Sequence, residues 1–442
     1  MAARGAVVIV LVAAACSTHD GPDASTDAAD GARLDSGRDA TDAGHDAPPD
    51  SPDTAPPDGW IRVTGSFPER ALVAVASPTL VASTHFVIET CPDRAGCRRI
   101  VQTWPSGECT AGGASCGAFS AGEANGNHDG TTGLVILGRQ SSRDIRENWV
   151  VDDQGNARAG FLGGTYPAPA FGAVDVDATS VLLSVYVGAV GADFETFAML
   201  APIDSPLTFA DLGEVNHITA GADVVQRWQL GASAIAAETT GLVVMRIPRD
   251  GSAGSIVTDG EGTLGAIVDD TIVFDRFDSP PGDIRISRHG GPSEVLIAGP
   301  QTNATRVATD GHDLVWLEYD YNSSGMAEHT TARTAPYVEH ASDVVGRVID
   351  TPDWAGLSSP ITVGFGYAGG VDAPGATGGI RIYRLADGYH ADIAPSTGEV
   401  WFSPDYIGPT EIAVASHRLA DRAATTQLCF IELASLDWQP PS

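Results

Sequence analysis

Short apolar runs, each ended by turn-forming residues, dominate the chain from Trp60 onward. The clearest are rich in β-branched or aromatic residues: LVILG (134–138), VLLSVYV (181–187), DTIVFDRF (270–277) and DLVWLEYD (313–320). Runs of this length bounded by Gly, Pro, Asn or Asp predict strands. Because no long stretch repeats its apolar residues every three to four positions, helices are not expected. The pattern therefore predicts an all-β body.

The predicted strands recur at a regular interval. Eight alternating segments can be superposed at one central residue each, namely Val101, Val151, Leu200, Ile247, Ile286, Ala332, Ile382 and Ile431. The successive gaps are 50, 49, 47, 39, 46, 50 and 49 residues. A period of 40 to 50 residues with several strands per unit is typical of a β-propeller, in which each blade covers the apolar face of its neighbour.

One unit carries a resemblance to known propeller repeats. TRVATDGHDLVWLEYDYNSSGMAEHTTART (305–334) resembles the YWTD-type and NHL-like repeats, with VWLEYD in the place of their aromatic-acidic strand, and GGIRIYRLADG (378–388) resembles their third strand and turn. The resemblance implies a propeller over most of residues 66–440. The repeat count predicts eight blades, with seven left open because the unit around Cys91 is irregular. Two separate sandwiches are the alternative.

The last unit shows only three evident strands, VWF, TEIAVAS and TQLCFIEL. A propeller closes when the missing strand of the last blade comes from the other end of the domain. We expect the segment from Trp60 to Thr64 to supply that strand.

The N-terminus has the three parts of an export signal. Arg4 is basic, Val7 to Val12 is an aliphatic run, and small residues precede Cys16. The apolar part is too short for a membrane-spanning helix, which needs about 20 residues. AAAC (13–16) resembles the bacterial lipoprotein cleavage box, which implies removal of residues 1–15 and a lipid on Cys16. Ser17 in place of Asp then favours the outer membrane, and ordinary secretory cleavage at the same place is the alternative.

Residues 16–59 are expected to be a disordered tether. Eleven Asp lie between positions 17 and 59, and Leu34 is the only large apolar residue there. Such a segment cannot bury enough apolar surface to offset the entropy of ordering. The predicted domains are therefore the signal peptide 1–15, the lipidated tether 16–59 and the propeller 60–442.

The charge of the chain limits its partners. The formal net charge is −32, and most of it lies outside the tether. Nucleic acid and anionic lipid surfaces require a concentrated positive face, so neither is an expected partner. We expect a monomer that is linked to the membrane through its lipid alone.

Five further cysteines accompany Cys16. Cys91 with Cys97 and Cys109 with Cys116 are the expected disulfides, although four cysteines allow three connectivities. A zinc site is the alternative, but spacings of five and six residues between ligands exceed those usual for zinc. Cys429 lies in an alternating strand and is expected to be a buried thiol.

One loop resembles a calcium-binding loop. In DYNSSGMAE, oxygen-bearing side chains recur at alternate positions, and the four candidate ligands are Asp320, Asn322, Ser324 and Glu328. Calcium prefers such oxygen ligands, but a plain hairpin turn uses the same residue types and is favoured. No other cofactor is expected.

The loops between second and third strands would crowd one rim of the propeller. Their charged residues, which are candidates for ligand binding, are Asp275, Asp278, Asp283, Asp372, Arg418 and Asp421. With no catalytic motif found, we expect an envelope-anchored binding or scaffolding module for a protein, peptide or glycan. The alternative is a propeller hydrolase or lyase acting on an exported polysaccharide or peptide, for which two of these carboxylates would have to converge.

Overall fold

A computed structural model provides the tertiary structure of the chain. It describes residues 60–63, 73–76, 85–91, 94–103, 133–142, 145–152, 154–164, 170–187, 195–203, 210–214, 225–250, 254–258, 260–276, 282–297, 303–321, 327–337, 344, 346–350, 361–372, 379–395, 399–418 and 427–441. All of them belong to one compact unit, Ala55–Ser442. The predicted signal peptide, Cys16 and the tether lie outside the described residues.

The described residues form thirty strands and one short 3-10 helix, so the all-β prediction is confirmed. Four sheets hold four strands each, in chain order. The first two are β12 (Val225–Leu230), β13 (Ala234–Thr239), β14 (Val244–Pro248) and β15 (Ser255–Ile256), then β16 (Gly262–Val268), β17 (Thr271–Arg276), β18 (Asp283–Arg288) and β19 (Glu294–Ile297). The next two are β20 (Asn303–Thr309), β21 (Asp313–Tyr321), β22 (Ala327–Pro336) and β23 (Arg347–Asp350), then β24 (Thr362–Gly364), β25 (Tyr367–Asp372), β26 (Gly379–Arg384) and β27 (His390–Ile393).

The two remaining sheets are larger. The five-stranded sheet contains β28 (Glu399–Ile407), β29 (Glu411–Arg418), β30 (Gln427–Glu432), β4 (Cys97–Thr103) and β3 (His85–Thr90), and the helix η3 (Leu433–Ser435) follows β30. The nine-stranded sheet contains β1 (Trp60–Val63), β2 (Val73–Ala76), β5 (Val135–Ser142), β6 (Ile145–Val151), β7 (Ala157–Gly164), β8 (Ala170–Val176), β9 (Ser180–Val187), β10 (Glu195–Pro202) and β11 (Ala210–Glu214).

The nine-stranded sheet consists of two antiparallel groups. A single parallel pair, Gly164 with Ala170, joins β7 to β8, whereas all other pairs in the sheet are antiparallel. Within the described residues, the six hydrogen-bonded sheets thus contain seven antiparallel groups, each of which we call a blade. The predicted count of eight blades is too high, because the described strands form only six hydrogen-bonded sheets.

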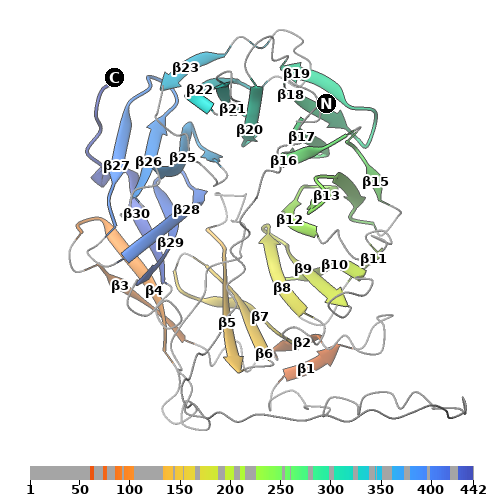
Figure 1. Cartoon of the computed structure of the whole chain (residues 1–442). Coiled ribbons are helices and arrows are strands. Elements are labelled where there is room, and N and C mark those ends of the chain that lie inside the picture. The colour runs from red at the N-terminus through yellow and green to blue at the C-terminus, as the bar shows by residue number, and fades with distance from the viewer. Residues whose placement is uncertain are drawn as a thin grey trace, which may run out of the picture. The chain divides into compact units, whose positions relative to one another are not determined.

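The sheets follow one another around a ring (Figure 1), and apolar clusters between neighbouring blades hold the ring together. One cluster joins β9 and β10 to the β12–β15 blade, and four more link each following blade to the next, up to the five-stranded one. A sixth packs Phe86, Tyr406 and Phe430 of the five-stranded blade against Val135 and Trp149 of the β5–β7 blade. Since β5 also contacts β8, the ring is closed. The propeller prediction is confirmed, and the two-sandwich alternative is wrong.

The closing strand differs from the expected one. β4 pairs with β30, from Ile100 opposite Leu428 to Cys97 opposite Ile431, and thereby joins both ends of the propeller. The segment at Trp60 instead pairs as β1 with β2, which pairs with β7. Both segments are short and mix apolar with polar residues, so their local pattern does not distinguish them. The choice depends on which one can pack beside β30.

The superposed repeat residues explain the miscount. Leu200, Ile247, Ile286, Ala332, Ile382 and Ile431 all occupy the third strand of a blade, and all are buried. Val101, however, lies on the closing strand β4, and Val151 lies on the second strand of its blade. One blade was therefore counted twice, because its fourth strand comes from the start of the domain.

Strand alternation sets which residues enter the core. In β26, Ile380 and Ile382 are fully buried while Arg381 between them is only partly buried. The period of two follows from the pleat, which directs successive side chains to opposite faces. Within the described part of the chain, no helix is long and apolar enough to span a membrane.

Candidate functional site

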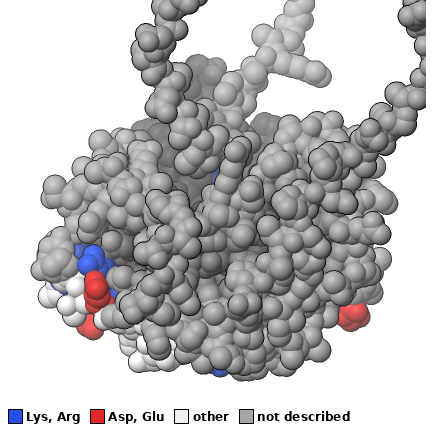
Figure 2. Space-filling view, turned by 90° about the horizontal axis from the view of Figure 1, so that it is seen from below, with Lys and Arg blue, Asp and Glu red and all other residues white. Residues whose placement is uncertain are grey.

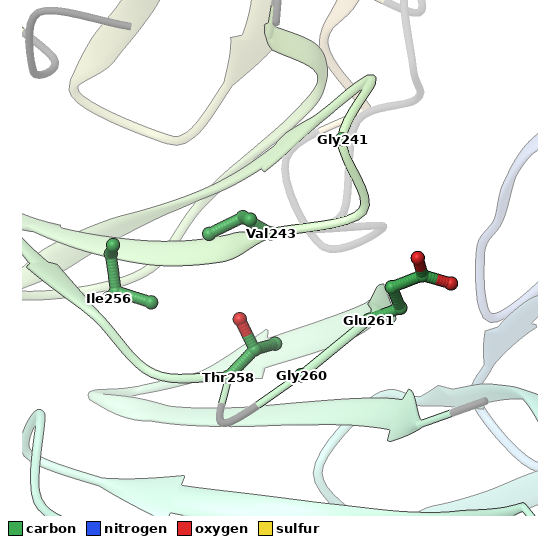
Figure 3. Close-up of a pocket in the computed structure, with 6 residues that line it drawn as sticks. All are labelled: Gly241, Val243, Ile256, Thr258, Gly260 and Glu261. Atoms are coloured by element: carbon green, nitrogen blue, oxygen red, sulfur yellow. The ribbon is translucent and has the colours of Figure 1, made fainter. Parts of the chain in front are cut away.

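A pocket of about 490 Å³ opens beside the β12–β15 blade. Its lining residues are Gly241, Val243, Ile256, Thr258, Gly260 and Glu261. Figure 3 shows Val243 and Ile256 toward one end and the carboxylate of Glu261 at the other. Ile256 is 57% exposed, although it is a large apolar residue. The pocket therefore presents an apolar surface and one acidic group to solvent.

Backbone hydrogen bonds hold the two pocket walls at a set spacing. One wall is the turn between β13 and β14, and the other is the end of β15 with its connection to β16. The backbone N–H of Gly262 donates to the carbonyl of Leu242 (2.8 Å), and that of Val257 donates to Val244 (2.9 Å). Leu242 has a φ of 59°, which is uncommon for a residue with a side chain. The pocket is thus formed by paired backbone as well as by side chains.

The pocket lies on the face where the ligand rim was predicted. In a blade of four antiparallel strands, the turn from second to third strand and the connection to the next blade lie at the same end. The prediction considered only the turns, so it missed Ile256 at the end of β15 and Glu261 in the connection that follows. The feature that could have indicated the pocket is Ile256, a large apolar residue that is exposed on the two-residue edge strand β15.

A buried polar layer lies next to the pocket. Glu238 on β13 accepts a hydrogen bond through Oε2 from the backbone N–H of Leu264 (2.8 Å) on the next blade. Gln229 on β12 donates to the carbonyl of Gly265 (3.1 Å) and accepts from the N–H of Ile267 (2.9 Å). These side chains tie one blade to the first strand of the following one.

Arg227 completes this layer. Its guanidinium donates to the carbonyls of Leu264 and Gly265. Burial lowers the pKa of Arg227, and the nearby carboxylates of Glu238 and Asp275 oppose that shift. The acidic groups and the guanidinium thus compensate one another's charge inside the ring.

Asp275 was predicted to be a rim ligand, but its side chain is buried, with 1% exposed. Its Oδ1 accepts hydrogen bonds from the N–H (3.0 Å) and the hydroxyl of Thr263 on β16. Its Oδ2 accepts from the N–H of Arg306 (2.7 Å) on β20 of the next blade. Asp275 therefore connects strands, and its position in the second strand keeps it from the rim surface.

Asp175 on β8 makes the same kind of connection two blades earlier. Its Oδ2 accepts a hydrogen bond from the N–H of Leu230 (2.6 Å), and its Oδ1 accepts from that of Val176 (2.8 Å). The side chain is fully buried. Burial raises the pKa of Asp175 well above its ordinary value, although the two backbone hydrogen bonds act in the opposite direction.

The other predicted rim residues are not brought to one described site. Asp283 begins β18 and forms ion pairs with Arg276 (3.4 Å) and Arg285 (3.2 Å). Asp372 and Arg418 end β25 and β29, but their side chains are outside the described part. Asp278 and Asp421 lie outside the described residues altogether.

The predicted calcium loop is described only at its ends. Asp320 lies near the end of β21 and is exposed, and Glu328 lies near the start of β22. Asn322 and Ser324 are outside the described residues. The ligand set therefore stays a prediction.

The disulfide between Cys91 and Cys97 is present, as predicted. Cys429 is buried and carries a thiol, also as predicted. Cys109 and Cys116 lie outside the described residues.

The opposite face of the ring is held by ion pairs and hydrogen bonds between blades. Arg246 on β14 binds Asp270 in the β16–β17 turn through two hydrogen bonds of 2.8 Å. Arg249 binds Asp177 (2.7 Å) in the β8–β9 turn of the preceding blade. These two ion pairs join neighbouring blades. Seen from below, described basic and acidic side chains also lie next to one another at the left of the molecule (Figure 2).

The described arrangement favours binding over acid–base chemistry. Glu238, Asp275 and Asp175 each accept hydrogen bonds from backbone N–H groups, which fixes them as structural links. The pocket has one carboxylate, Glu261, among apolar and small residues. An open site of this kind can hold an apolar side chain beside a cationic group.

No family model matches the chain, and no curated protein matches it. Among solved structures, the chain is similar to the WD40 domain of SCAP from fission yeast, at 9% identity and a TM-score of 0.39, covering 85% of this chain and 98% of that one. It is also similar to BamB from Moraxella catarrhalis (12% identity, TM-score 0.36, covering 68% and 94%). A third similar structure is TolB from Acinetobacter baumannii (10% identity, TM-score 0.33, covering 70% and 83%).

Proposed function

We propose that this protein is a non-enzymatic binding module, anchored to the cell envelope by a lipid on Cys16, that holds a protein or peptide through the pocket face of its propeller. The acidic segment 17–59 would act as the spacer between lipid and propeller. The lipid also places the protein in the outer membrane, since Ser17 follows Cys16.

The observation that carries the proposal is the exposed apolar surface of the pocket. Val243 and Ile256, which come from its two walls, form that surface, and Ile256 is 57% exposed. Covering an apolar side chain contributes roughly 25 cal/mol per Å² of surface removed from water. An apolar side chain of a ligand that covers Ile256 and Val243 would therefore add this free energy to binding.

Glu261 indicates the chemistry of the ligand. It is exposed at the pocket edge, and the chain as a whole carries a net charge of −32. An acidic surface speeds association with a basic partner. The ligand class that fits is an apolar residue followed by Lys or Arg on an extended peptide or a protein loop.

Selection from a displayed peptide library would test the proposal, with a chain that lacks residues 1–15 and carries Cys16→Ser as bait. We expect enriched peptides to combine an apolar residue with a basic one. Ile256→Asp should weaken their binding at least tenfold, because it places a charge on the apolar wall, and Glu261→Arg should weaken it through repulsion.

Val295→Asp is the matched control. Val295 is 43% exposed on β19, the outer strand of the next blade, and does not line the pocket. Its substitution should leave binding unchanged. Equal loss in both variants, or enrichment of peptides that ignore Ile256 and Glu261, would contradict the pocket assignment. Turnover of a glycan or peptide in a substrate screen would overturn the non-enzymatic role.

A further inference from the structure

Three cysteine sulfur atoms gather where the two ends of the propeller meet. The Sγ atoms of Cys91, Cys97 and Cys429 all lie within 4.8 Å of one another. Cys91 and Cys97 form a disulfide, while Cys429 carries a thiol. A thiol and a disulfide are the two reactants of thiol–disulfide exchange, and here they lie next to each other.

The sheet register orders the three residues. The backbone N–H of Cys91 donates to the carbonyl of Cys97 (2.9 Å), so these two face each other across the β3–β4 hairpin. On the other side of β4, Cys97 pairs with Ile431, and Cys429 is two residues away on β30. Residues two apart on one strand share a face, so Cys97 and Cys429 are diagonal neighbours. Cys97 therefore lies between the other two.

We infer that these three residues form a thiol–disulfide exchange site in which the bond moves from Cys91–Cys97 to Cys97–Cys429. The thiol of Cys429 gives its proton to solvent, and the thiolate attacks Sγ of Cys97. As the new S–S bond forms, the old one breaks, and its electron pair leaves with Cys91, which takes up a proton. The number of disulfides and thiols is unchanged, so no external oxidant or reductant is consumed.

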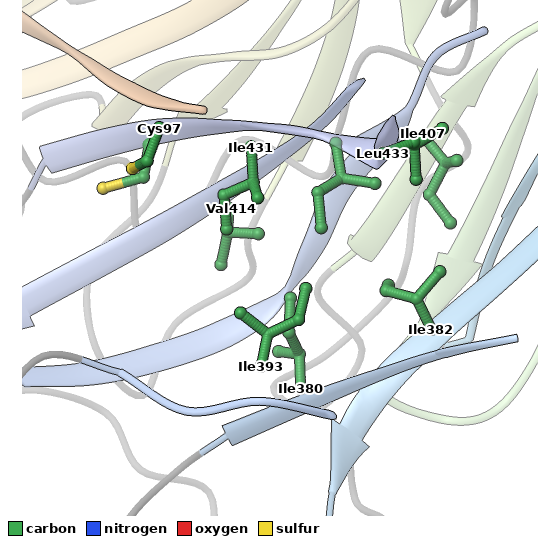
Figure 4. Packing of buried hydrophobic residues seen from close by; sticks show 10 residues of the cluster. Cys97, Ile380, Ile382, Ile393, Ile407, Val414, Ile431 and Leu433 are labelled. Carbon is green, nitrogen blue, oxygen red and sulfur yellow. The ribbon is translucent and has the colours of Figure 1, made fainter. Parts of the chain in front are cut away.

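The three cysteines differ in burial, so the exchange changes how accessible the thiol is, and an experiment can measure that change. Cys97 and Cys429 are 6% and 4% exposed, and both belong to the apolar cluster of the last two blades. Figure 4 shows Cys97 at one side of that cluster, near Val414 and Ile431. Cys91 is less buried and packs at its edge. The exchange therefore moves the thiol from a buried residue to a more accessible one.

The new bond would join strands from opposite ends of the domain. The Cys91–Cys97 disulfide closes a loop within one hairpin, with a sequence separation of 6. A Cys97–Cys429 bond would instead enclose nearly the whole propeller. Because the entropy that a disulfide removes from the unfolded chain grows with the loop it closes, the exchanged form should resist unfolding better. The site would thus lock the ring covalently.

The exchange can be measured on the full-length protein without denaturant. The protein is held at pH 9, above the ordinary thiol pKa of about 8.5, then quenched in acid, alkylated and mapped by mass spectrometry. We expect a linked Cys97–Cys429 peptide together with alkylated Cys91, both increasing with time. Cys429→Ser should abolish both signals.

A second variant isolates the new bond. Cys91→Ser leaves Cys97 and Cys429 as thiols, and mild oxidation should link them and raise the melting temperature by about 3 to 5 °C relative to the reduced variant.

Three results would overturn the inference. One is wild-type protein that contains only the Cys91–Cys97 linkage after prolonged incubation at pH 9. Another is a Cys91→Ser variant that keeps both thiols on oxidation. The third is mixed linkages that involve Cys109 or Cys116 to the same extent, since these would indicate general scrambling.

Discussion

Asp275 Oδ2 accepts a hydrogen bond from the backbone N–H of Arg306 at 2.7 Å, which joins β17 to the first strand of the following blade. Arg306 has a φ of 56° and lies where the register of β20 shifts against β21. The carboxylate thus satisfies a backbone donor that the bulge leaves without a strand partner. Asp275, which we expected to be a rim ligand, therefore links two neighbouring blades through its hydrogen bonds.

Asp275→Ala should destabilise the propeller. It removes the acceptor of three hydrogen bonds, two of them from backbone N–H groups, and leaves these donors buried. We expect a loss of about 3 kcal/mol in the free energy of unfolding, measured by urea denaturation. Asp320→Ala, which changes an exposed carboxylate on the next blade, should cost less than about 0.5 kcal/mol. Equal costs would show that Asp275 is not a structural link.

Asp175 should make the stability of the protein fall as the pH rises. Burial raises the pKa of Asp175 well above that of the unfolded chain, so the folded state holds a proton that the unfolded state releases. The folded state therefore loses stability from the unfolded pKa, near 3.9, up to the folded pKa. Asp175→Asn cannot ionise, and its stability relative to the wild type should improve between pH 4 and 8. A difference that is constant with pH would contradict this assignment.

Asp270 should have the opposite dependence. Burial alone would raise its pKa, but hydrogen bonds from His289 and Arg246 outweigh burial and lower the pKa below the ordinary value. Asp270 therefore contributes to the free energy of unfolding at pH values above its pKa in the unfolded chain. This contribution is lost as the pH falls through its lower pKa in the folded protein. Asp270→Asn should cost about 1 to 2 kcal/mol at pH 7, and the difference should shrink below pH 4.

The control for Asp270 is its neighbour Asp269. Asp269 is exposed and has a φ of 53°, which Asn tolerates well. Asp269→Asn should leave thermal denaturation nearly unchanged at every pH. A pH dependence shared by both variants would point to general charge effects.

Cys16→Ser tests the proposed anchor. Without the thiol no lipid can be attached, so the folded protein should move from the membrane to the soluble fraction on cell fractionation. Cys429→Ser is the control, because this buried cysteine belongs to the propeller and should leave fractionation unchanged. Membrane association that persists in Cys16→Ser would exclude anchoring through that residue.

The strands and the propeller class could be predicted from the chain because they rest on local properties. Alternation places Ile247, Ile286 and Ile382 at matching positions of their blades, and hairpin turns keep consecutive strands together. The Cys91–Cys97 disulfide could also be predicted from the chain, because two cysteines at a sequence separation of 6 can pair within one hairpin.

The candidate site was predicted only as a face of the ring. The turns between second and third strands were expected to form a ligand rim, whereas the pocket is also lined by Ile256 at the end of β15 and by Glu261 in the β15–β16 connection. Asp275 was misassigned because an acidic residue close to a loop looks the same whether it points to solvent or accepts backbone hydrogen bonds. Burial depends on the neighbouring blade, which the local sequence does not reveal.

The amino-acid sequence by itself determined an all-β chain of repeated units, because strand periodicity and turn chemistry act over a few residues. Only the tertiary structure decided that β4 closes the ring, that the described strands form six hydrogen-bonded sheets, and that Cys429 lies beside the Cys91–Cys97 bond. Each of these depends on contact between residues hundreds of positions apart. Such contacts are selected by packing of whole blades around a closed ring, and local pattern does not encode them.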